Sequence, residues 1–266
     1  MMAGPSSVSS PDTVGGSDVS VWLSRLPAQP DLAAMGRCLD AAERTRLQGL
    51  APVRQQEFAL SRWLIRQALA RASGLEPDLC APVPGRPVRS ARPEGWSLSL
   101  SHSHGVAACA ISAGTAVGVD LEPLVRRSAW QQVVRRWFTP AEQAWLLADG
   151  QHLDFLRVWT LKEAWLKATG RGIAGHLQTL EVGAGGQLHG DDRRYPWRGG
   201  TGTVADMMLA VVYSDERQSR GAPAVHWLTA PTRATTGPAP EPPPEPAAMA
   251  WWTHTHIDTE AHHDRP

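Results

Sequence analysis

Two segments of the sequence match each other, and this repeat limits the folds open to the chain. Residues 63–74 read WLIRQALARASG and residues 159–170 read WTLKEAWLKATG, with Trp, two Ala and Gly shared at an offset of 96. Upstream, Glu43 in DAAER has a counterpart in Glu142 of TPAEQ. The repeat predicts two similar halves packed about a pseudo-twofold axis, with a cleft between them for a ligand. Chance similarity between two amphipathic helices is the alternative.

The two segments differ in their charged residues. The second has an acid and two lysines where the first has neither: Lys162 for Arg66, Glu163 for Gln67 and Lys167 for Arg71. These are the two lysines of the chain, whereas the other 24 of its 26 basic residues are arginine. An ammonium group is a compact charge whose proton can be transferred, which guanidinium does not offer. The differences therefore predict a specialised site in the second half.

The rest of the chain groups its helical patterns between sets of strand patterns. Strand patterns occupy residues 19–26 and the runs SLSLSHS, VAACAISA, AVGVDLEP, TVADMMLAVVYS and AVHWLTA. Helical patterns occupy LDAAERTRLQGL, PVRQQEFALSRWLIRQALARASG, TPAEQAWLLAD and HLDFLRVWTLKEAWLKATG. This order predicts an α+β fold, with an N-terminal half at residues 19–113 and a C-terminal half at residues 114–230 that carries the site.

Both ends of the chain are predicted to be disordered. Residues 1–18 are rich in Ser, Gly and Pro, and residues 231–266 begin with a Pro-rich run that neither packs nor pairs readily. Four of the ten histidines lie in this tail. We interpret them as solvated and not as a metal site, because no Cys or ordered scaffold accompanies them. Deleting residues 237–266 is therefore expected to leave activity unchanged.

Composition excludes several classes of function. The chain of 266 residues has 26 basic and 26 acidic side chains, so it lacks the basic excess of a general nucleic-acid or membrane-surface binder. Cys38, Cys80 and Cys109 form no CxxC pair and indicate thiols in a reducing compartment. The sequence contains no signal-peptide pattern and no membrane-spanning stretch. We therefore expect a cytoplasmic protein.

Three carboxylates predict a cation site. Asp120 and Glu122 in GVDLEP are two apart in a strand pattern, so both side chains project from one face. Trp159, Glu163 and Lys167 follow one another at intervals of four along one face of a helix. Mg²⁺ would relieve the repulsion between the adjacent acids, because it takes carboxylate oxygens together with substrate phosphate oxygens, and Glu163 would complete its site. A surface salt bridge on the helix and two solvated acids at a strand end are the alternatives.

Polar and basic residues elsewhere are candidates for binding phosphate. Ser101, His102 and Ser103 in SLSHSHG supply hydroxyls and an imidazole at a strand end. Arg62 in LSRWLIR and Arg86 in PGRPV would clamp phosphate oxygens beside a metal. Taken alone, the first group is typical of a turn and the arginines are typical of a protein surface.

The runs SLSLSHSHGVAACA, GVDLEP, FTPAE and WTLKEAWLKATGRGI, in this order and spacing, resemble a known family. They are similar to the larger, pseudo-dimeric class of 4'-phosphopantetheinyl transferases, often called Sfp-type. The resemblance covers about residues 19–230. It implies two similar halves, each a sheet with a long packed helix, in agreement with the repeat.

The resemblance implies a reaction and its partners. The enzyme would take the phosphopantetheine arm from coenzyme A, attach it to a serine of an apo acyl or peptidyl carrier protein, and release adenosine 3',5'-bisphosphate. Such carriers serve fatty-acid, polyketide or nonribosomal peptide synthesis. A monomer is expected, because the duplication supplies both halves of what would otherwise be a dimer.

The resemblance also implies roles for individual residues. Asp120, Glu122 and Glu163 would bind Mg²⁺ together with the coenzyme A pyrophosphate. Glu163 would also take the proton from the serine hydroxyl, and Lys167 would neutralise the leaving phosphate. The implied catalytic set is Glu163, Lys167 and His102, and the implied coenzyme A-binding set is Arg62, Arg86, Ser101, His102, Lys162 and Lys167.

Two other functions share part of this pattern. A non-catalytic binder of coenzyme A or a nucleotide would keep the fold with an incomplete set of acids. An Mg²⁺-dependent phosphodiesterase would share the carboxylates but would have no need of a carrier-docking surface.

Overall fold

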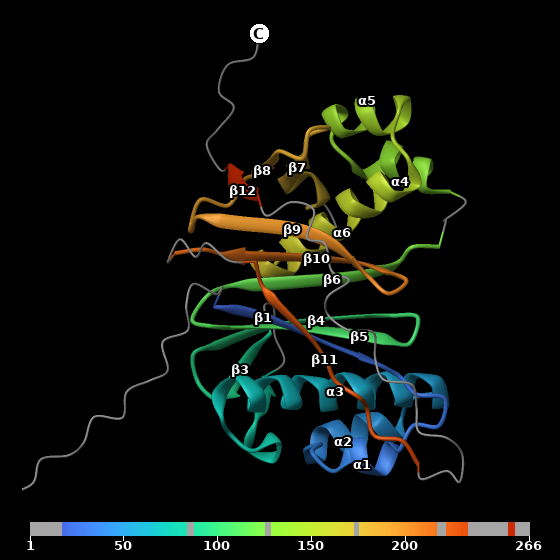
Figure 1. Cartoon of the computed structure of the whole chain (residues 1–266), viewed down its shortest axis with the longest axis vertical. Coiled ribbons are helices and arrows are strands. Elements are labelled where there is room, and N and C mark those ends of the chain that lie inside the picture. The colour runs from blue at the N-terminus through green and yellow to red at the C-terminus, as the bar shows by residue number, and fades with distance from the viewer. Residues whose placement is uncertain are drawn as a thin grey trace, which may run out of the picture.

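The computed structural model describes residues 18–83, 88–125, 129–172, 176–216, 222–233 and 255–258 (Figure 1). Its helices are α1 (Leu32–Gly36), α2 (Ala41–Gln48), α3 (Pro52–Ser73), α4 (Trp130–Trp137), α5 (Pro140–Ala148) and α6 (His152–Thr169), with short 3-10 turns η1 (Pro77–Leu79) and η2 (Leu177–Thr179). Its strands are β1 (Val19–Arg25), β2 (Ala81–Val83), β3 (Arg89–Arg92), β4 (Trp96–Ser103), β5 (Val106–Ala113), β6 (Val117–Pro123), β7 (Leu180–Val182), β8 (Leu188–Gly190), β9 (Trp197–Val204), β10 (Met207–Ser214), β11 (Ala224–Trp227) and β12 (Thr255–Asp258). The predicted α+β fold is confirmed.

Local signals in the sequence account for the limits of the two long helices. Pro52 stands in the first turn of α3, where its missing N–H has no helical partner to lose. Gly74 and Gly170 follow α3 and α6 with φ of 76°, a left-handed conformation that glycine adopts without strain. Neither these helices nor any other in the described ranges combines the length and the apolar character that crossing a bilayer requires.

The strands form two six-stranded sheets. The first has the order β11-β1-β5-β4-β3-β2 and the second has the order β6-β10-β9-β12-β8-β7. Without β11 and β12, the two orders correspond strand for strand, with β1 matching β6, β5 matching β10 and β4 matching β9. The same architecture is therefore used twice.

The strand registers repeat as well as the strand order. In the first sheet Val21 pairs with Ala110, and at the corresponding place in the second sheet Val119 pairs with Val211. The tight turns that join β4 to β5 and β9 to β10 each contain a residue with positive φ, His104 at 48° and Ala205 at 51°. The correspondence supports duplication of one ancestral half, while the pseudo-twofold axis stays a prediction.

Three apolar clusters hold the layers together. One packs α3 against the first sheet, a second lies between the two sheets, and a third packs α4, α5 and α6 against the second sheet. Representative members are Leu64 and Ile111 in the first, Val21 and Val119 in the second, and Trp165 and Val212 in the third. In Figure 1 the α1–α3 helices lie on the far side of the first sheet from the second, and α4–α6 gather at the opposite end of the molecule.

Two late strands depart from the predicted organisation. β11, from the part of the chain assigned to the C-terminal half, pairs in parallel with β1 of the first sheet. β12 lies in the tail that was predicted to be disordered, yet it pairs with β9 and β8 of the second sheet. Ile257 of β12 is fully buried in the third cluster. The prediction of disorder is therefore wrong for residues 255–258, and the expectation that deleting residues 237–266 is harmless is withdrawn.

Replacing Ile257 with Ala is expected to lower the free energy of unfolding by about 2–4 kcal/mol. The change removes buried methyl groups beside Gly190 and leaves a cavity in the third cluster. Urea unfolding measures the effect, with Leu153→Ala as the control because Leu153 is 40% exposed on α6. Equal unfolding midpoints for the Ile257→Ala variant and the parent would contradict the burial of β12.

Candidate active site

The predicted acids meet where β6 runs against α6. Along β6, Val117, Val119 and Leu121 belong to the cluster between the sheets, so the alternate residues face the other way, toward α6. A Cβ atom added at Gly118 would lie 1.9 Å from the carbonyl oxygen of Ala164, because strand and helix backbones touch at this point. Glycine is therefore required at position 118, and this close approach brings the acids of β6 next to those of α6.

Lys167 pairs with Asp120 across this contact. Its Nζ atom lies 2.8 Å from Oδ1 of Asp120 and donates a second hydrogen bond, of 3.0 Å, to the carbonyl oxygen of Val119. Ser101 also donates to Asp120 Oδ1, at 2.8 Å. Lys167 therefore forms its ion pair between α6 and β6, and not the surface salt bridge within α6 that was the alternative to a cation site.

Glu163 is the strongest candidate for chemistry in this cluster. Its side chain is almost buried, and its Oε1 atom has no hydrogen-bond partner among the described residues. The pKa of Glu163 is raised to about 7, mainly by burial and in part by the negative charges of Asp120 and Glu122, while Lys167 acts in the opposite direction. A carboxyl group with a pKa near neutral pH suits proton transfer.

Glu122 lies at the rim of the cluster. It is half-buried on β6 and its Oε1 atom accepts a hydrogen bond of 3.3 Å from Nε1 of Trp159. Trp159 in turn stacks on Phe138 and Phe155, with ring centroids 6.4 and 6.1 Å away. The tryptophan that starts the repeated segment therefore connects Glu122 to the aromatic core of the C-terminal half.

The carboxylate oxygens of the cluster are ligands that suit a hard divalent cation, although the three side chains do not converge on one point. Among the residues that the structure describes, no three acidic, histidine or cysteine side chains converge as a preformed metal cluster. Two buried carboxylate oxygens, Asp120 Oδ2 and Glu163 Oε1, nevertheless have no hydrogen-bond partner in the described chain. Buried charged oxygens need a cation or a donor, and oxygen ligands are those that Mg²⁺ prefers.

The structure places Lys162 outside this cluster, contrary to its predicted role in binding coenzyme A. Its side chain is fully buried on another face of α6, because neighbouring helix residues point about 100° apart. Nζ lies 2.8 Å from Glu142 Oε1, donates to the carbonyl oxygen of Leu177 at 2.7 Å, and also donates to that of Leu180. Burial lowers the pKa of Lys162 while Glu142 opposes this. Lys162 therefore holds α5, α6 and the η2 turn together.

The N-terminal half contains the same structural pair. Arg66 of α3 lies 2.7 Å from Glu43 of α2, at the positions that correspond to Lys162 and Glu142. Both glutamates also close a capping box at the start of their helix, with Asp40 and Thr139 as the capping residues. One lysine of the repeat thus belongs to the fold and the other to the site.

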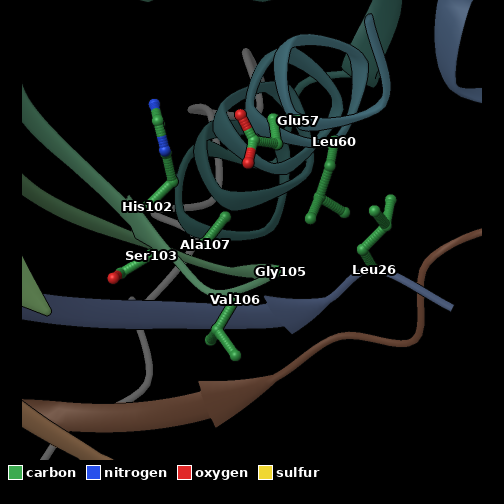
Figure 2. A pocket seen from close by; sticks show the side chains of 8 residues that line it. All are labelled: Leu26, Glu57, Leu60, His102, Ser103, Gly105, Val106 and Ala107. Carbon is green, nitrogen blue, oxygen red and sulfur yellow. The ribbon is translucent and has the colours of Figure 1, made fainter. Parts of the chain in front are cut away.

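Two of the three polar residues predicted at the end of β4, Ser101 and His102, lie on opposite faces of the strand. The Ser101 hydroxyl reaches Asp120, whereas His102 is exposed on the side of β4 that faces α3. Figure 2 shows His102 above the strand beside Glu57 and Leu60 of α3, lining a pocket near the Gly105 turn. The structure does not bring His102 to the acids, and its contact with phosphate stays a prediction.

The structure describes one of the two arginines that were predicted to bind phosphate. Arg62 lies on α3, with Nε 3.5 Å from Glu43 Oε1 and its guanidinium 5.1 Å from the ring centre of Phe58. Burial lowers the pKa of Arg62. These contacts are within the N-terminal half, away from β6. Arg86 lies outside the described residues.

Sequence reasoning missed the contacts that cross between elements. Gly118 and Ser99 were not singled out, although Gly118 sets the distance between β6 and α6 and Ser99 contacts the backbone of β6. A signal was present in the repeat, since VSVWLSR at residues 19–25 corresponds to VGVDLEP at residues 117–123. That alignment places Gly and both acids where the first half has Ser, Trp and Ser.

Comparison with known proteins places the chain in a family. The model of the 4'-phosphopantetheinyl transferase superfamily matches residues 116–205, and that of the 4'-phosphopantetheinyl transferase N-terminal domain matches residues 42–112. The 4'-phosphopantetheinyl transferase HetI of Nostoc sp. is 34% identical over 177 residues, which cover 62% of this chain and 73% of HetI. The 4'-phosphopantetheinyl transferase of Bacillus subtilis is 30% identical over 125 residues, 45% of this chain and 54% of that protein. The chain therefore belongs to the 4'-phosphopantetheinyl transferase superfamily, in its Sfp-type class with an N-terminal domain, and is a transferase.

Proposed function

We propose that the enzyme moves the 4'-phosphopantetheine arm of coenzyme A to a serine hydroxyl of an apo acyl or peptidyl carrier protein. Adenosine 3',5'-bisphosphate is the other product. One observation carries the proposal: Glu163 is buried and unpartnered at Oε1, with a pKa of about 7, beside two further acids and Lys167. Membership of the superfamily supports the class of reaction, and Glu163 is the general base that we propose for it.

The residues of the site divide the work of phosphoryl transfer. Glu163 takes the proton from the attacking serine hydroxyl, because its buried carboxylate has an oxygen, Oε1, with no hydrogen-bond partner in the described chain. Lys167 places a positive charge where the leaving phosphate gains negative charge. His102 and the arginines of the N-terminal half are the candidates for holding the coenzyme A phosphates, whereas the predicted phosphate ligand Ser101 donates a hydrogen bond from its hydroxyl to Asp120.

Asp120, Glu122 and Glu163 would hold the Mg²⁺ ion. When bound, Mg²⁺ would offset the negative charge of the pyrophosphate oxygens and of the three acids themselves. The unpartnered Asp120 Oδ2 and Glu163 Oε1 support this assignment. We further propose a cytoplasmic monomer that serves carriers of fatty-acid, polyketide or nonribosomal peptide synthesis.

Intact-mass spectrometry of an apo carrier protein tests the proposal. Incubation with coenzyme A, Mg²⁺ and the enzyme is expected to add one phosphopantetheine to the carrier, and EDTA is expected to prevent the addition. Cleavage of coenzyme A without a change in the carrier would favour the phosphodiesterase. Binding of coenzyme A with neither change would favour the non-catalytic binder, which the complete set of acids argues against.

A further inference from the structure

The strand that carries Asp120 lies at an open edge of its sheet. β6 pairs with β10 on one side, and in the described chain no strand pairs with its other side. Backbone N–H and C=O groups on such an edge need partners when they are buried. Val119 presents both of its groups on this side, and both are satisfied by side chains: the N–H donates to Ser99 Oγ at 3.0 Å, and the C=O accepts from Lys167 Nζ.

Two serines of the N-terminal half form hydrogen bonds with this edge of β6. Ser99 and Ser101 stand two apart on β4, so their side chains leave the same face of the strand. Ser99 accepts from the backbone of β6, and Ser101 donates to the carboxylate of the next residue, Asp120. Both serines are at least 90% buried. The hydroxyls therefore take the place of a neighbouring strand and contact the site from across the interface between the halves.

The other half of the molecule provides an internal comparison. β4 and β9 correspond in register, since Trp96 and Trp197 start the two strands and pair with the last residues of β5 and β10. At the positions of Ser99 and Ser101, β9 has Gly200 and Gly202. The edge of β1, which corresponds to the open edge of β6, is covered by a true strand, β11. At these two positions, β4 has the hydroxyls that contact β6 and Asp120, and β9 has glycine.

We propose that Ser99 and Ser101 are positioning residues, through which the N-terminal half fixes the backbone of Val119 and the carboxylate of Asp120 for phosphopantetheine transfer. The inference rests on the proposed function. Ser101 and Lys167 both bind Oδ1, and this leaves Oδ2 of Asp120 as its free ligand oxygen. Ser99 acts one residue earlier, because it accepts the N–H of Val119, the residue before Asp120. The two halves must then keep their relative position for the site to work.

Alanine variants with a matched control test the proposal. Ser101→Ala is expected to lower kcat about tenfold at saturating coenzyme A with little change in KM for the carrier, since it removes one hydrogen bond to a charged oxygen. Ser101→Thr, which keeps the hydroxyl, is expected to restore most of the rate. Ser97→Ala is the control, because Ser97 lies on the same face of β4. In the described chain, Ser97 forms no hydrogen bond with Val119 or Asp120.

Hydrogen exchange gives a measurement that does not depend on turnover. Ser99→Ala is expected to raise the exchange rate of the Val119 amide about tenfold by NMR, while Ser97→Ala leaves it unchanged. Faster exchange together with lower kcat supports the proposal. Parental kcat in both the Ser99→Ala and Ser101→Ala variants, or slow Val119 exchange in Ser99→Ala, overturns it. If the parent itself fails to load a carrier, the proposed function is wrong, and Val119 exchange alone decides whether the serines hold the edge.

Discussion

Replacing Glu163 with Gln is expected to lower kcat for phosphopantetheine transfer by about 10³. The amide keeps the shape of the side chain but takes up no proton, so the attacking hydroxyl loses its base, an effect of about 10²–10⁴ in other enzymes. The same change removes one of the three proposed Mg²⁺ ligands. Steady-state kinetics with saturating coenzyme A and Mg²⁺ measures the loss.

The fold of the Glu163→Gln variant is expected to be intact. The pH dependence of its stability tests this expectation. Burial raises the pKa of Glu163 from its ordinary value of 4.5 to about 7, so between these values the folded chain keeps a proton that the unfolded chain has released. The parent therefore loses stability as pH rises from 4.5 to 7, by about 3 kcal/mol in total. The amide does not titrate. Without Mg²⁺, urea unfolding is thus expected to show a more stable variant at pH 8 and no difference near pH 4.

A control lies at the matching position of the other half. Gln67 of α3 corresponds to Glu163, and its Oε1 atom accepts a hydrogen bond of 2.6 Å from Arg71. Gln67→Glu is expected to leave transfer unchanged, because the N-terminal half has Trp22 where the C-terminal half has Asp120. Near-parental turnover of Glu163→Gln with Mg²⁺ present would contradict both proposed roles of Glu163.

Features that depend on neighbouring residues could be predicted from the sequence. Helix limits at Pro52, Gly74 and Gly170 follow from conformational preferences of single residues. The shared face of Asp120 and Glu122 follows from the alternation of a strand, and the repeat follows from direct comparison. These predictions needed no knowledge of which segments meet in space.

Features that depend on distant partners could not be predicted in this way. The role of Lys162 is set by Glu142 and by carbonyl groups 15 and 18 residues further along the chain, so the sequence motif alone did not separate it from Lys167. The short β12 follows a Pro-rich run and is a strand because β8 and β9 flank it. The Asp120–Lys167 pair joins residues 47 apart, and the close contact at Gly118 brings them together.

Lys167→Arg is expected to lower turnover by about 10² or more, almost as far as Lys167→Ala. A single nitrogen atom of Lys167 donates to both Asp120 Oδ1 and the Val119 carbonyl oxygen. A guanidinium group spreads its donors over a rigid planar fork on a longer side chain, so it reproduces this convergence poorly, and it does not release a proton to a leaving phosphate. Kinetics of both variants at saturating coenzyme A, with unfolding curves to confirm the fold, measures the effect.

The corresponding arginine of the other half shows what the larger group does at this position. Arg71 is exposed on α3, with its guanidinium 6.0 Å from the ring centre of Trp22 and a hydrogen bond to Gln67. Its guanidinium group lies along the surface of a half that has Trp22 and Ser24 at the positions of Asp120 and Glu122. Arg71→Lys is therefore expected to leave turnover within about twofold of the parent. If Lys167→Arg retained turnover within a few-fold of the parent, positive charge alone would suffice at position 167, and the bridge from Lys167 to Val119 and Asp120 would have no part in the rate.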